Sequence, residues 1–401
     1  METDILIAGG GLVGLSLALA LSGSGLRVTL VDRQPLGESA RGADERHLAL
    51  SEVSCRILDA LDVLPLLGAD AEPIRAIHVS SAGEFGAVRW AARDSGRERF
   101  GMIAPARRLL LALQRAVQAR PDLEVIAPAA VVQAVPGADH IVAILEGAAN
   151  TRCNARLLVI ADGVESSLRA DTGIGTIRHD YQRTAICCAL RPERDHGGTA
   201  YERFTRSGPV ALLPQSGGRC GAVHVVHTDA AVRLLALSER EYLGELQAAF
   251  GYRLGRLRQA GERVAYPLRR VIAERLTAPR QVLVGNAAQA VHPVGAQGFN
   301  LGVRDAATLA ERLLQVHRAG ADPGSPSLLE GYAQARAGDR AATTDLSHAL
   351  ALATVPNLAP MRWLRSLSLL AADRIAPLRE HLQLGGMGFR GATPQLARTS
   401  Q

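Results

Sequence analysis

The chain begins with a short apolar run, Asp4 to Ala8 (DILIA), in which hydrophobic and polar residues do not alternate. Such a run predicts a strand that is buried on both faces, as in a parallel sheet. The glycine-rich stretch Gly9 to Gly14 predicts a turn, and the continuous apolar stretch Leu15 to Ser22 predicts a buried helix. Arg27 to Val31 (RVTLV) predicts a second strand. The chain therefore opens with a strand, a helix and a parallel strand.

Two later apolar runs have the same character as the first. Arg156 to Ala161 (RLLVIA) leads into Asp162-Gly163, and Gln281 to Val284 (QVLV) leads into Gly285-Asn286. Both runs predict buried strands that end in a small or polar turn. Ligands of open α/β sheets bind beyond the carboxyl ends of such strands, so these turns are candidates for a binding site.

Between these strands the pattern changes to short alternating runs that are separated by Gly, Pro and Ser. They occur from Ile77 to Trp90 and from about Ala185 to Tyr266, and they predict an antiparallel sheet. From about Ser327 onward the chain is rich in Ala and Leu and predicts helices, with breaks at its prolines.

These patterns predict an α/β fold: a Rossmann-type nucleotide-binding domain with a mainly parallel sheet, an antiparallel-sheet substrate domain, and C-terminal helices. The nucleotide-binding domain is expected to be discontinuous, because the alternating segments interrupt it twice. The expected division is 1–75, 101–175 and 266–330 for the nucleotide-binding domain, 76–100 and 176–265 for the substrate-binding sheet domain, and 331–401 for the helical region.

Composition supports a globular protein and excludes some chemistry. Of the 401 residues, 47% are hydrophobic and 21% are charged, so the chain can bury a sizeable core. All 45 basic residues are arginine, against 39 acidic ones, which excludes Schiff-base chemistry and a P-loop lysine. The net charge of +6 is spread along the chain, and no basic run indicates nucleic acid.

The cysteines favour a reducing compartment. Their number is five and they include no C-x-x-C pair, so neither a disulfide framework nor a metal site is indicated. No charged leader with a cleavage site precedes the first strand, and no uncharged run of about 20 apolar residues follows. We therefore expect a cytoplasmic protein that is neither secreted nor membrane-spanning.

The first turn carries a dinucleotide fingerprint. Gly9, Gly11 and Gly14 satisfy G-x-G-x-x-G directly after a strand and at the start of a helix, and Asp32 ends the next strand. The glycines permit a tight turn, a close approach of the backbone to a pyrophosphate, and close packing of helix against strand. The helix N-terminus supplies free N–H groups to the phosphates, and Asp32 is expected to accept hydrogen bonds from the ribose hydroxyls.

The later turns indicate which dinucleotide is bound. Ala161-Asp162-Gly163, with Ser166 and Arg169 after it, and Gly285-Asn286-Ala287-Ala288 resemble the second and third signatures of the single-component flavin hydroxylases, whose best-known members hydroxylate p-hydroxybenzoate. The resemblance spans nearly the whole chain and implies FAD as the cofactor. It implies that Asp162 lies near the junction of the flavin and nicotinamide sites, and that Gly285 and Asn286 bind the ribityl and pyrophosphate part of FAD.

One branch of that family is a closer match. Most members begin the third turn with Gly-Asp-Ala-Ala-His, whereas this chain has Asn286 and Gln289. This sequence motif resembles that of the ubiquinone-biosynthesis hydroxylases, in particular the 2-octaprenyl-6-methoxyphenol hydroxylases. Further likeness lies at Asp44-x-Arg46, at Glu202-Arg203-Phe204-Thr205 with Gly208-Pro209, and in the stretch Leu246 to Gly251. The resemblance implies that Arg46 lies by the FAD pyrophosphate.

The loop from Pro293 to Asn300 is the expected reaction centre. A helix that begins near Gly298 would direct N–H groups and its positive dipole end at flavin N1 and the C2 carbonyl, where negative charge would be stabilised. We expect Pro293, Gln297 and Gly298 to carry catalysis, and Gly298 and Asn300 to bind the cofactor. The family loop runs Pro-x-x-Gly-Gln-Gly, but Ala296 occupies the first glycine position here. Either Ala296 is strained in a left-handed conformation, or the loop has shifted by one residue onto Gly295.

The resemblance implies a hydroxylase in which NAD(P)H, as a transient co-substrate, reduces FAD. O2 then adds at flavin C4a, and the hydroperoxide attacks the ring of a polyprenyl phenol. Two alternatives remain open at this point. One is an FAD-dependent reductase of isoprenoid double bonds, which would consume no O2. The other is a flavoprotein scaffold of a quinone-synthesis complex in which the flavin is structural only.

A polyprenyl substrate stays in the bilayer, because each exposed methylene costs about 0.8 kcal/mol, so the enzyme must come to it. The stretch Leu346 to Leu384 interleaves leucines and Trp363 with Arg362, Arg365, Arg374 and Arg379, which suits an amphipathic helix at an anionic lipid surface. The same spacing also suits residues that cap the core or bury a subunit contact. We expect the protein to be peripheral at the inner membrane, either directly or through a ubiquinone-synthesis complex.

Overall fold

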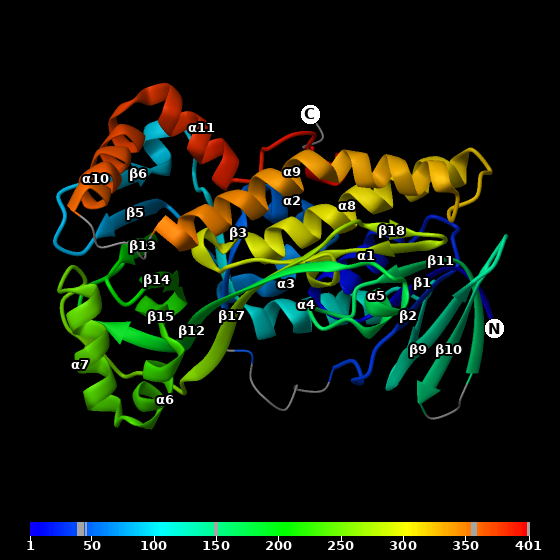
Figure 1. Cartoon of the computed structure of the whole chain (residues 1–401), viewed down its shortest axis with the longest axis horizontal. Coiled ribbons are helices and arrows are strands. Elements are labelled where there is room, and N and C mark those ends of the chain that lie inside the picture. The colour runs from blue at the N-terminus through cyan, green and yellow to red at the C-terminus, as the bar shows by residue number, and fades with distance from the viewer. Residues whose placement is uncertain (38–43, 45, 148–150, 354–358, 399–401) are drawn as a thin grey trace.

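The computed structural model describes the chain except for residues 38–43, 45, 148–150, 354–358 and 399–401. The molecule is elongated, with one sheet at each end and two long helices running between them (Figure 1). The long helices are α8 (Gln297–Arg318) and α9 (Pro326–Ala353). This arrangement separates a nucleotide-binding half from a half that is built on a second sheet.

The first sheet has a parallel centre. Its strand order is β18 (Thr277–Ala278), β19 (Gln281–Leu283), β11 (Thr151–Ile160), β1 (Glu2–Ala8), β2 (Val28–Val31) and β8 (Leu123–Ile126). The strands from β19 to β8 run parallel, whereas β18, β9 (Ala129–Pro136) and β10 (Ile141–Gly147) are antiparallel additions. The four predicted buried strands are confirmed as β1, β2, β11 and β19, and the predicted helix is confirmed as α1 (Leu12–Leu21).

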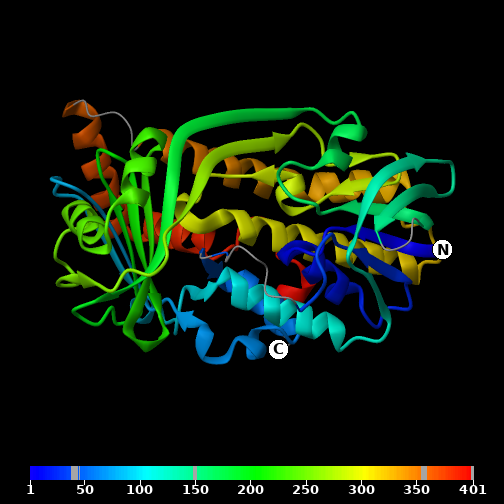
Figure 2. The same ribbon diagram turned by 90° about the horizontal axis from the view of Figure 1, so that it is seen from below.

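The second sheet is antiparallel except for one pair of strands. Its order is β20 (Gln289–Ala290), β17 (Val264–Ala273), β12 (Thr176–Pro192), β15 (Arg219–His227), β14 (Pro209–Gln215), β13 (Thr199–Phe204), β5 (Ala76–Ser81) and β6 (Ala87–Ala91), with β16 (Leu257–Arg258) beside β12. Only β13 and β5 pair in parallel among these strands. The long strands β12 and β17 connect the two halves (Figure 2), so β17 crosses the expected boundary between 265 and 266.

The two faces of the second sheet have different neighbours. Helices α6 (Thr228–Ala236) and α7 (Glu239–Phe250) cover one face, where Ile186, Leu212 and Tyr242 are buried together. The other face turns toward the nucleotide-binding half, because Leu213 on it packs beside Ile103 of the small third sheet. That third sheet has the order β3 (His47–Ser51), β7 (Gly101–Pro105) and β4 (Glu72–Pro73).

The remaining helices complete the two halves. They are α2 (Glu52–Ala60), α3 (Leu64–Leu67), α4 (Ala106–Gln118), α5 (Ser167–Asp171), α10 (Ala359–Arg374) and α11 (Ala376–Gly386). Short 3-10 turns lie at η1 (Gly68–Asp70), η2 (Ala92–Ser95), η3 (Ser216–Gly218), η4 (Gly285–Ala287), η5 (Val294–Ala296) and η6 (Gln395–Ala397). The predicted helical C-terminal region is confirmed, and α10 and α11 lie at the same end of the molecule as β5, β6 and β13 (Figure 1). In the part of the chain that the structure describes, none of the helices is both long enough and apolar enough to cross a bilayer.

Candidate active site

The predicted binding turns meet at one edge of the first sheet. Strands β19, β11, β1 and β2 are parallel neighbours, so their carboxyl ends point the same way. The glycine turn follows β1, Asp32 follows β2, Asp162 follows β11 and Gly285 follows β19 soon after Leu283. Segments that are far apart in the sequence therefore meet at one edge of the sheet, as expected for a dinucleotide site.

Three glycines of the first turn have distinct steric roles. A Cβ on Gly14 would lie 1.9 Å from the carbonyl oxygen of Gly9, and a Cβ on Gly9 would lie 2.5 Å from that of Ala161. Both positions therefore exclude any side chain, because backbone atoms cannot move aside. Gly11 is different, since a Cβ there would have no atom within 4 Å. The space beside Gly11 is open, and this cradle fits the close approach of a pyrophosphate.

Asp32 holds the glycine turn in place. One carboxylate oxygen accepts the N–H of Gly10 at 2.6 Å, and the other accepts the N–H of Gln34 at 2.7 Å. Each oxygen keeps a second acceptor site. The carboxylate can therefore shape the turn and still accept from a ribose hydroxyl.

Asp162 and Arg169 form the second turn. Asp162 is exposed at the cleft edge, and desolvation by the surrounding protein raises the pKa of its carboxyl. The Arg169 side chain is buried and donates to the carbonyl of Val164 at 2.9 Å and to that of Ala287 at 2.8 Å. Arg169 thus ties the second turn to the third, a role that the sequence motif did not reveal.

In the third turn, the exposed Asn286 stands between buried neighbours. Gly285 has φ +58° and packs against helix α1, where a Cβ would lie 2.9 Å from Cγ2 of Val13. Asn286 points away from this packing, since its side chain is exposed whereas Gly285 and Ala287 are buried. An exposed amide beside the cleft can donate to or accept from a polar ligand.

A buried polar network holds the third turn from below, and it explains Gln289. The Gln289 amide donates to Asp305 at 2.5 Å and accepts from Arg340 at 2.9 Å. Asp305 also accepts the Gly285 N–H at 3.3 Å and pairs with Arg336 at 2.7 Å. A glutamine can both donate and accept, so it matches a carboxylate on one side and a guanidinium on the other.

The loop before α8 is shifted by one residue relative to the family pattern, so the left-handed residue is not Ala296. Gly295 has φ +71°, so the left-handed conformation falls on a glycine. Helix α8 begins at Gln297, one residue before the predicted start at Gly298. Pro293 is exposed, and the Gln297 side chain donates to the carbonyl of Gly295 at 2.9 Å. The helix N-terminus therefore begins with Gln297 and Gly298, both of which are partly exposed.

His292 stabilises this loop as a neutral side chain. Its Nδ1 accepts the N–H of Val294 at 3.1 Å, and its carbonyl accepts the hydroxyl of Ser347 at 3.0 Å. Burial lowers the pKa of His292 to about 4. The ring therefore supports the loop at neutral pH, with its proton on Nε2.

Two predicted cofactor residues have protein partners. The Asn300 amide accepts from the Ser51 N–H and donates to the Ala49 carbonyl, each at 2.8 Å, so it joins α8 to β3. Arg46 pairs with Asp44 at 2.6 Å and lies 5.2 Å from the ring centroid of Tyr266. Asn300 is buried, whereas the Arg46 side chain keeps about half of its exposure at 47%.

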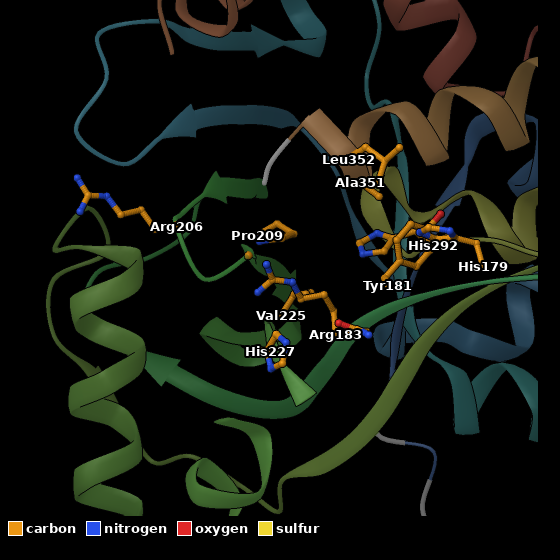
Figure 3. A pocket seen from close by; sticks show the side chains of 12 residues that line it. His179, Tyr181, Arg183, Arg206, Pro209, Val225, His227, His292, Ala351 and Leu352 are labelled. Carbon is orange, nitrogen blue, oxygen red and sulfur yellow. The ribbon is translucent and has the colours of Figure 1, made fainter. Parts of the chain in front are cut away.

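A cavity of about 300 Å³ lies between the second sheet and the loop of His292. Figure 3 shows Pro209 and Val225 of the sheet on one side, with Tyr181 and His292 on the other. Leu352, near the end of α9, also lines the cavity. The cavity therefore adjoins the predicted reaction loop, and the second sheet lines it with both apolar and polar side chains, among the latter Arg183 and His227.

Tyr181 is a pocket residue that the sequence analysis missed. Its hydroxyl hydrogen-bonds with Nδ1 of His348 at 2.9 Å, and its ring meets that of His292 edge to face with centroids 5.0 Å apart. His179 packs against both Tyr181 and His348. These residues come from β12, α9 and the loop, so no local motif indicated them.

Comparison with known proteins gives a family match over most of the chain. The model of the FAD binding domain family matches residues 2–347. A ubiquinone hydroxylase, UbiL, of Rhodospirillum rubrum is 36% identical over 396 residues, which is 98% of this chain and 92% of that protein. The 3-demethoxyubiquinol 3-hydroxylase of Escherichia coli is 29% identical and covers 96% of this chain and 99% of its own.

Solved structures show the same fold. The p-nitrophenol 4-monooxygenase PnpA of Pseudomonas putida superposes with a TM-score of 0.80 at 19% identity, over 97% of this chain and 99% of that one. The anhydrotetracycline hydroxylase OxyS of Streptomyces rimosus superposes with a TM-score of 0.71 at 23% identity, over 96% and 76%. The predicted fold class is thereby confirmed.

Proposed function

The chain belongs to the FAD binding domain family and, within it, groups with ubiquinone hydroxylases, and we propose that it hydroxylates the ring of a polyprenyl phenol in ubiquinone biosynthesis. The observation that carries this proposal is the cavity between the second sheet and the loop before α8. Its lining combines apolar side chains such as Pro209, Val225 and Leu352 with polar ones such as Tyr181, Arg183 and His227. Such a mixture suits an aromatic ring with one or two hydroxyls. NAD(P)H and O2 are the proposed co-substrates.

The residues of the first sheet fit FAD, because the cradle at Gly9 and Gly14 has no room for side chains and Gly11 leaves space for phosphate. We assign the pyrophosphate to Gly9, Gly11 and Gly14, and the ribose to Asp32. When bound, FAD supplies the redox chemistry that hydroxylation needs. The role of the glycine cradle is to bind the cofactor.

The flavin half of FAD is assigned to the other turns. Asp162, Gly285 and Asn286 lie at the carboxyl ends of β11 and β19, and the exposed Asn286 amide suits a ribityl hydroxyl. Arg46, which forms an ion pair with Asp44, is assigned to the pyrophosphate of FAD. Asn300 is assigned a positioning role as well, since its amide fixes α8 against β3 beside the cofactor.

Pro293, Gln297 and Gly298 form the proposed reacting end of the site. Free N–H groups at the start of α8 and the positive end of its dipole would stabilise negative charge near Gly298. Helix α8 is 22 residues long, so its dipole is well developed. Pro293 is exposed beside the cavity loop and is proposed to line the face on which oxygen reacts.

We propose that the enzyme reaches its substrate at the membrane through an apolar surface, the α10 patch, which consists of Phe85, Trp363, Leu364 and Leu367. These four side chains are exposed by 55%, 62%, 59% and 54%. The rings of Phe85 and Trp363 are in contact, with centroids 5.3 Å apart. A cluster of aromatic and leucine side chains at one site suits insertion at a lipid interface. Helix α10, which carries three of the four residues, lies at the same end of the molecule as the second sheet (Figure 1).

Two arginines of α10, Arg362 and Arg365, are engaged by protein groups. Arg365 pairs with Glu84, which precedes Phe85 in the chain, and Arg362 donates to the carbonyl of Gly83 at 3.2 Å. Both side chains therefore hold α10 against the turn between β5 and β6. We accordingly propose that the α10 patch binds lipid mainly through its apolar side chains, in a protein that works at the cytoplasmic side of the inner membrane.

The test of the proposed reaction uses purified holoprotein. Anaerobic NADPH or NADH should reduce the flavin, and subsequent ¹⁸O2 should place one labelled oxygen on the ring of a short-chain prenyl phenol. Reduction of an isoprenoid double bond without O2 uptake would instead establish the reductase. Failure of both nicotinamides to reduce the bound flavin would favour the scaffold.

A further inference from the structure

Glu202 is a partly buried carboxylate in a row of small and apolar residues that crosses the second sheet. It lies in β13, in register with Val79 of β5 on one side and Ala211 of β14 on the other. Further along the same row come Val223 of β15 and Cys187 of β12. Every neighbour of Glu202 in this row is therefore small or apolar.

This face is the one that turns toward the nucleotide-binding half. Side chains alternate along a strand, so Glu202 shares its face with Ala200, which packs in the same cluster as Ile103 of β7. The intervening residue, Tyr201, points the other way and meets Phe250 of α7 with ring centroids 5.8 Å apart. Glu202 consequently faces the cofactor side of the sheet and not the helices behind it.

The cavity lies within reach of Glu202. Pro209, which lines the cavity, pairs with Phe204 and stands diagonal to Glu202 across β13 and β14. Diagonal neighbours on one face of an antiparallel pair are about 7–8 Å apart, a distance that long side chains can span. A ring in the cavity can therefore direct a hydroxyl at the Glu202 carboxylate.

Glu202 has no partner that would explain its presence. It makes no hydrogen bond or ion pair with the residues that the structure describes, and burial alone raises the pKa of its carboxyl to about 7. Other polar groups toward this face include the Arg46 and Asp44 pair beside Tyr266, and His47, which lies against Gly221. Arg183 and His227, which line the cavity, and Ser81, which pairs with Phe204, also lie on this face. A partly buried carboxylate that has apolar neighbours and no partner is poorly solvated, so a role in binding or chemistry is indicated.

We propose that Glu202 is the base that removes the proton from the ring hydroxyl of the phenolic substrate. This inference rests on the proposed function, because it requires a phenol in the cavity. In the step, the phenol O–H bond breaks and a Glu202 Oε–H bond forms, so the carboxylate becomes neutral and the phenol becomes a phenolate. The total charge stays at one negative charge, and no other reactant is needed.

The proton transfer favours the reaction through its effects on the substrate ring and on the Glu202 carboxyl. A phenolate donates electron density to its ring more strongly than a phenol does, so the ring attacks an electrophilic oxygen more readily. The Glu202 carboxyl becomes neutral in a site where its charge is poorly solvated. A carboxyl in an apolar site is also closer to a phenol in proton affinity than an exposed one, which makes the proton easier to share.

The experiment measures the ionisation of a bound phenol without requiring turnover. The probe is 2-prenyl-4-nitrophenol, whose phenolate absorbs visible light, and it is titrated into oxidised holoprotein between about pH 6 and pH 8. The variants are Glu202→Gln and, as a matched control, Glu146→Gln, which changes an exposed glutamate on strand β10. Glu202→Asp keeps a carboxylate on a shorter side chain and provides a second test if the glutamine variant does not fold.

We expect wild type and Glu146→Gln to bind the probe largely as phenolate at a pH where Glu202→Gln binds it as the neutral phenol. In Glu202→Gln the apparent pKa of the bound probe should rise by about one unit. This corresponds to a ~tenfold lower phenolate fraction where phenolate is the minor form of the bound probe. Glu202→Asp should give an intermediate value. Equal phenolate fractions in all four proteins would overturn the assignment of Glu202 while leaving the proposed function intact. A wild-type protein that reduces its flavin with NAD(P)H but neither binds the probe nor hydroxylates a short-chain prenyl phenol would overturn the proposed function itself.

Discussion

The guanidinium of Arg169 donates to the carbonyl of Ala287 at a distance of 2.8 Å, across 118 residues of sequence. It also donates to the carbonyl of Val164, which follows the Asp162 turn. One buried side chain therefore sets the separation of the second and third turns. If both turns contact FAD, their spacing must match the cofactor.

Replacement of Arg169 by Met should weaken FAD binding at least ~tenfold, because each lost hydrogen bond from a charged donor contributes about 1.5–3 kcal/mol. Arg169→Lys should recover only part of the loss, since an ammonium group lacks the planar fork that reaches both carbonyls. Flavin fluorescence during titration of apoprotein measures the affinity. Arg178→Met, at an arginine that is about half exposed, is the control. Unchanged affinity in Arg169→Met would remove the link between the two turns.

Substitutions at Gly14 and Gly11 should separate folding from cofactor binding. A Cβ at Gly14 collides with the Gly9 carbonyl, whereas a Cβ at Gly11 meets no protein atom within 4 Å. Gly14→Ala should therefore lower the thermal midpoint of the apoprotein, while Gly11→Ala should leave it unchanged and still weaken FAD binding, because the methyl group occupies space that the pyrophosphate needs. Calorimetry of the apoproteins and FAD titration provide the two measurements. Normal FAD affinity in Gly11→Ala would show that the phosphates lie elsewhere.

The pH dependence of stability should reveal the carboxyl of Glu202. Burial raises its pKa from 4.5 to about 7 in the folded protein. Because the folded state holds the proton more tightly than the unfolded state, stability is lost as pH rises from 4.5 through 7. Glu202→Gln cannot ionise, so its advantage over wild type should grow across this range, to at most about 3 kcal/mol, and then level off.

Urea unfolding at a series of pH values checks this expectation. His292, whose burial lowers the pKa to about 4, contributes an opposite trend, but it does so in both proteins and cancels in the difference. Glu146→Gln, at an exposed glutamate, is measured beside Glu202→Gln as the matched control. A difference between Glu202→Gln and wild type that does not change with pH would mean that the Glu202 carboxyl is solvated or paired in the folded protein.

Much of the fold could be predicted from the sequence, because the buried parallel strands are continuous apolar runs and their turns are rich in glycine. The start of α8 was predicted to within one residue. The residue in the left-handed conformation could be narrowed to Ala296 or Gly295, and the structure selects Gly295. The pocket could not be predicted in this way. Tyr181 and His348 are 167 residues apart and meet through a hydrogen bond that no local pattern encodes.

The surface arginines illustrate the same limit. Sequence spacing suggested that Arg362 and Arg365 face anionic lipid, but their partner Glu84 lies in another element and precedes Arg365 by 281 residues. Glu202 was part of a motif that indicated only family likeness. Its isolation became visible once the register of β13 with β14 and β5 showed which side chains surround it.

The α10 patch should mediate membrane binding. Purified protein should float with liposomes, and Trp363→Ala combined with Leu367→Ser should remain with the unbound protein, since both changes remove exposed apolar area. Because Arg362 and Arg365 are held by protein partners, neutral liposomes should support most of the binding. The matched control combines Tyr252→Ala with Val232→Ser, which alters an aromatic and an aliphatic residue that are 68% and 72% exposed elsewhere. Equal flotation of both double variants would exclude the patch, and a failure of wild type to float would leave delivery through a partner protein.

The most direct test of the central claim is the profile of prenylated quinone intermediates in cells that lack this protein, measured by mass spectrometry. The account predicts loss of ubiquinone and accumulation of a prenylated intermediate that lacks one ring hydroxyl. Wild-type protein should restore ubiquinone, and Gly11→Ala, which should fold but bind FAD poorly, should not. Intermediates that differ only in side-chain double bonds would contradict hydroxylation in favour of isoprenoid reduction. Full restoration by a Gly11→Ala protein shown to lack FAD would contradict any catalytic role for the flavin.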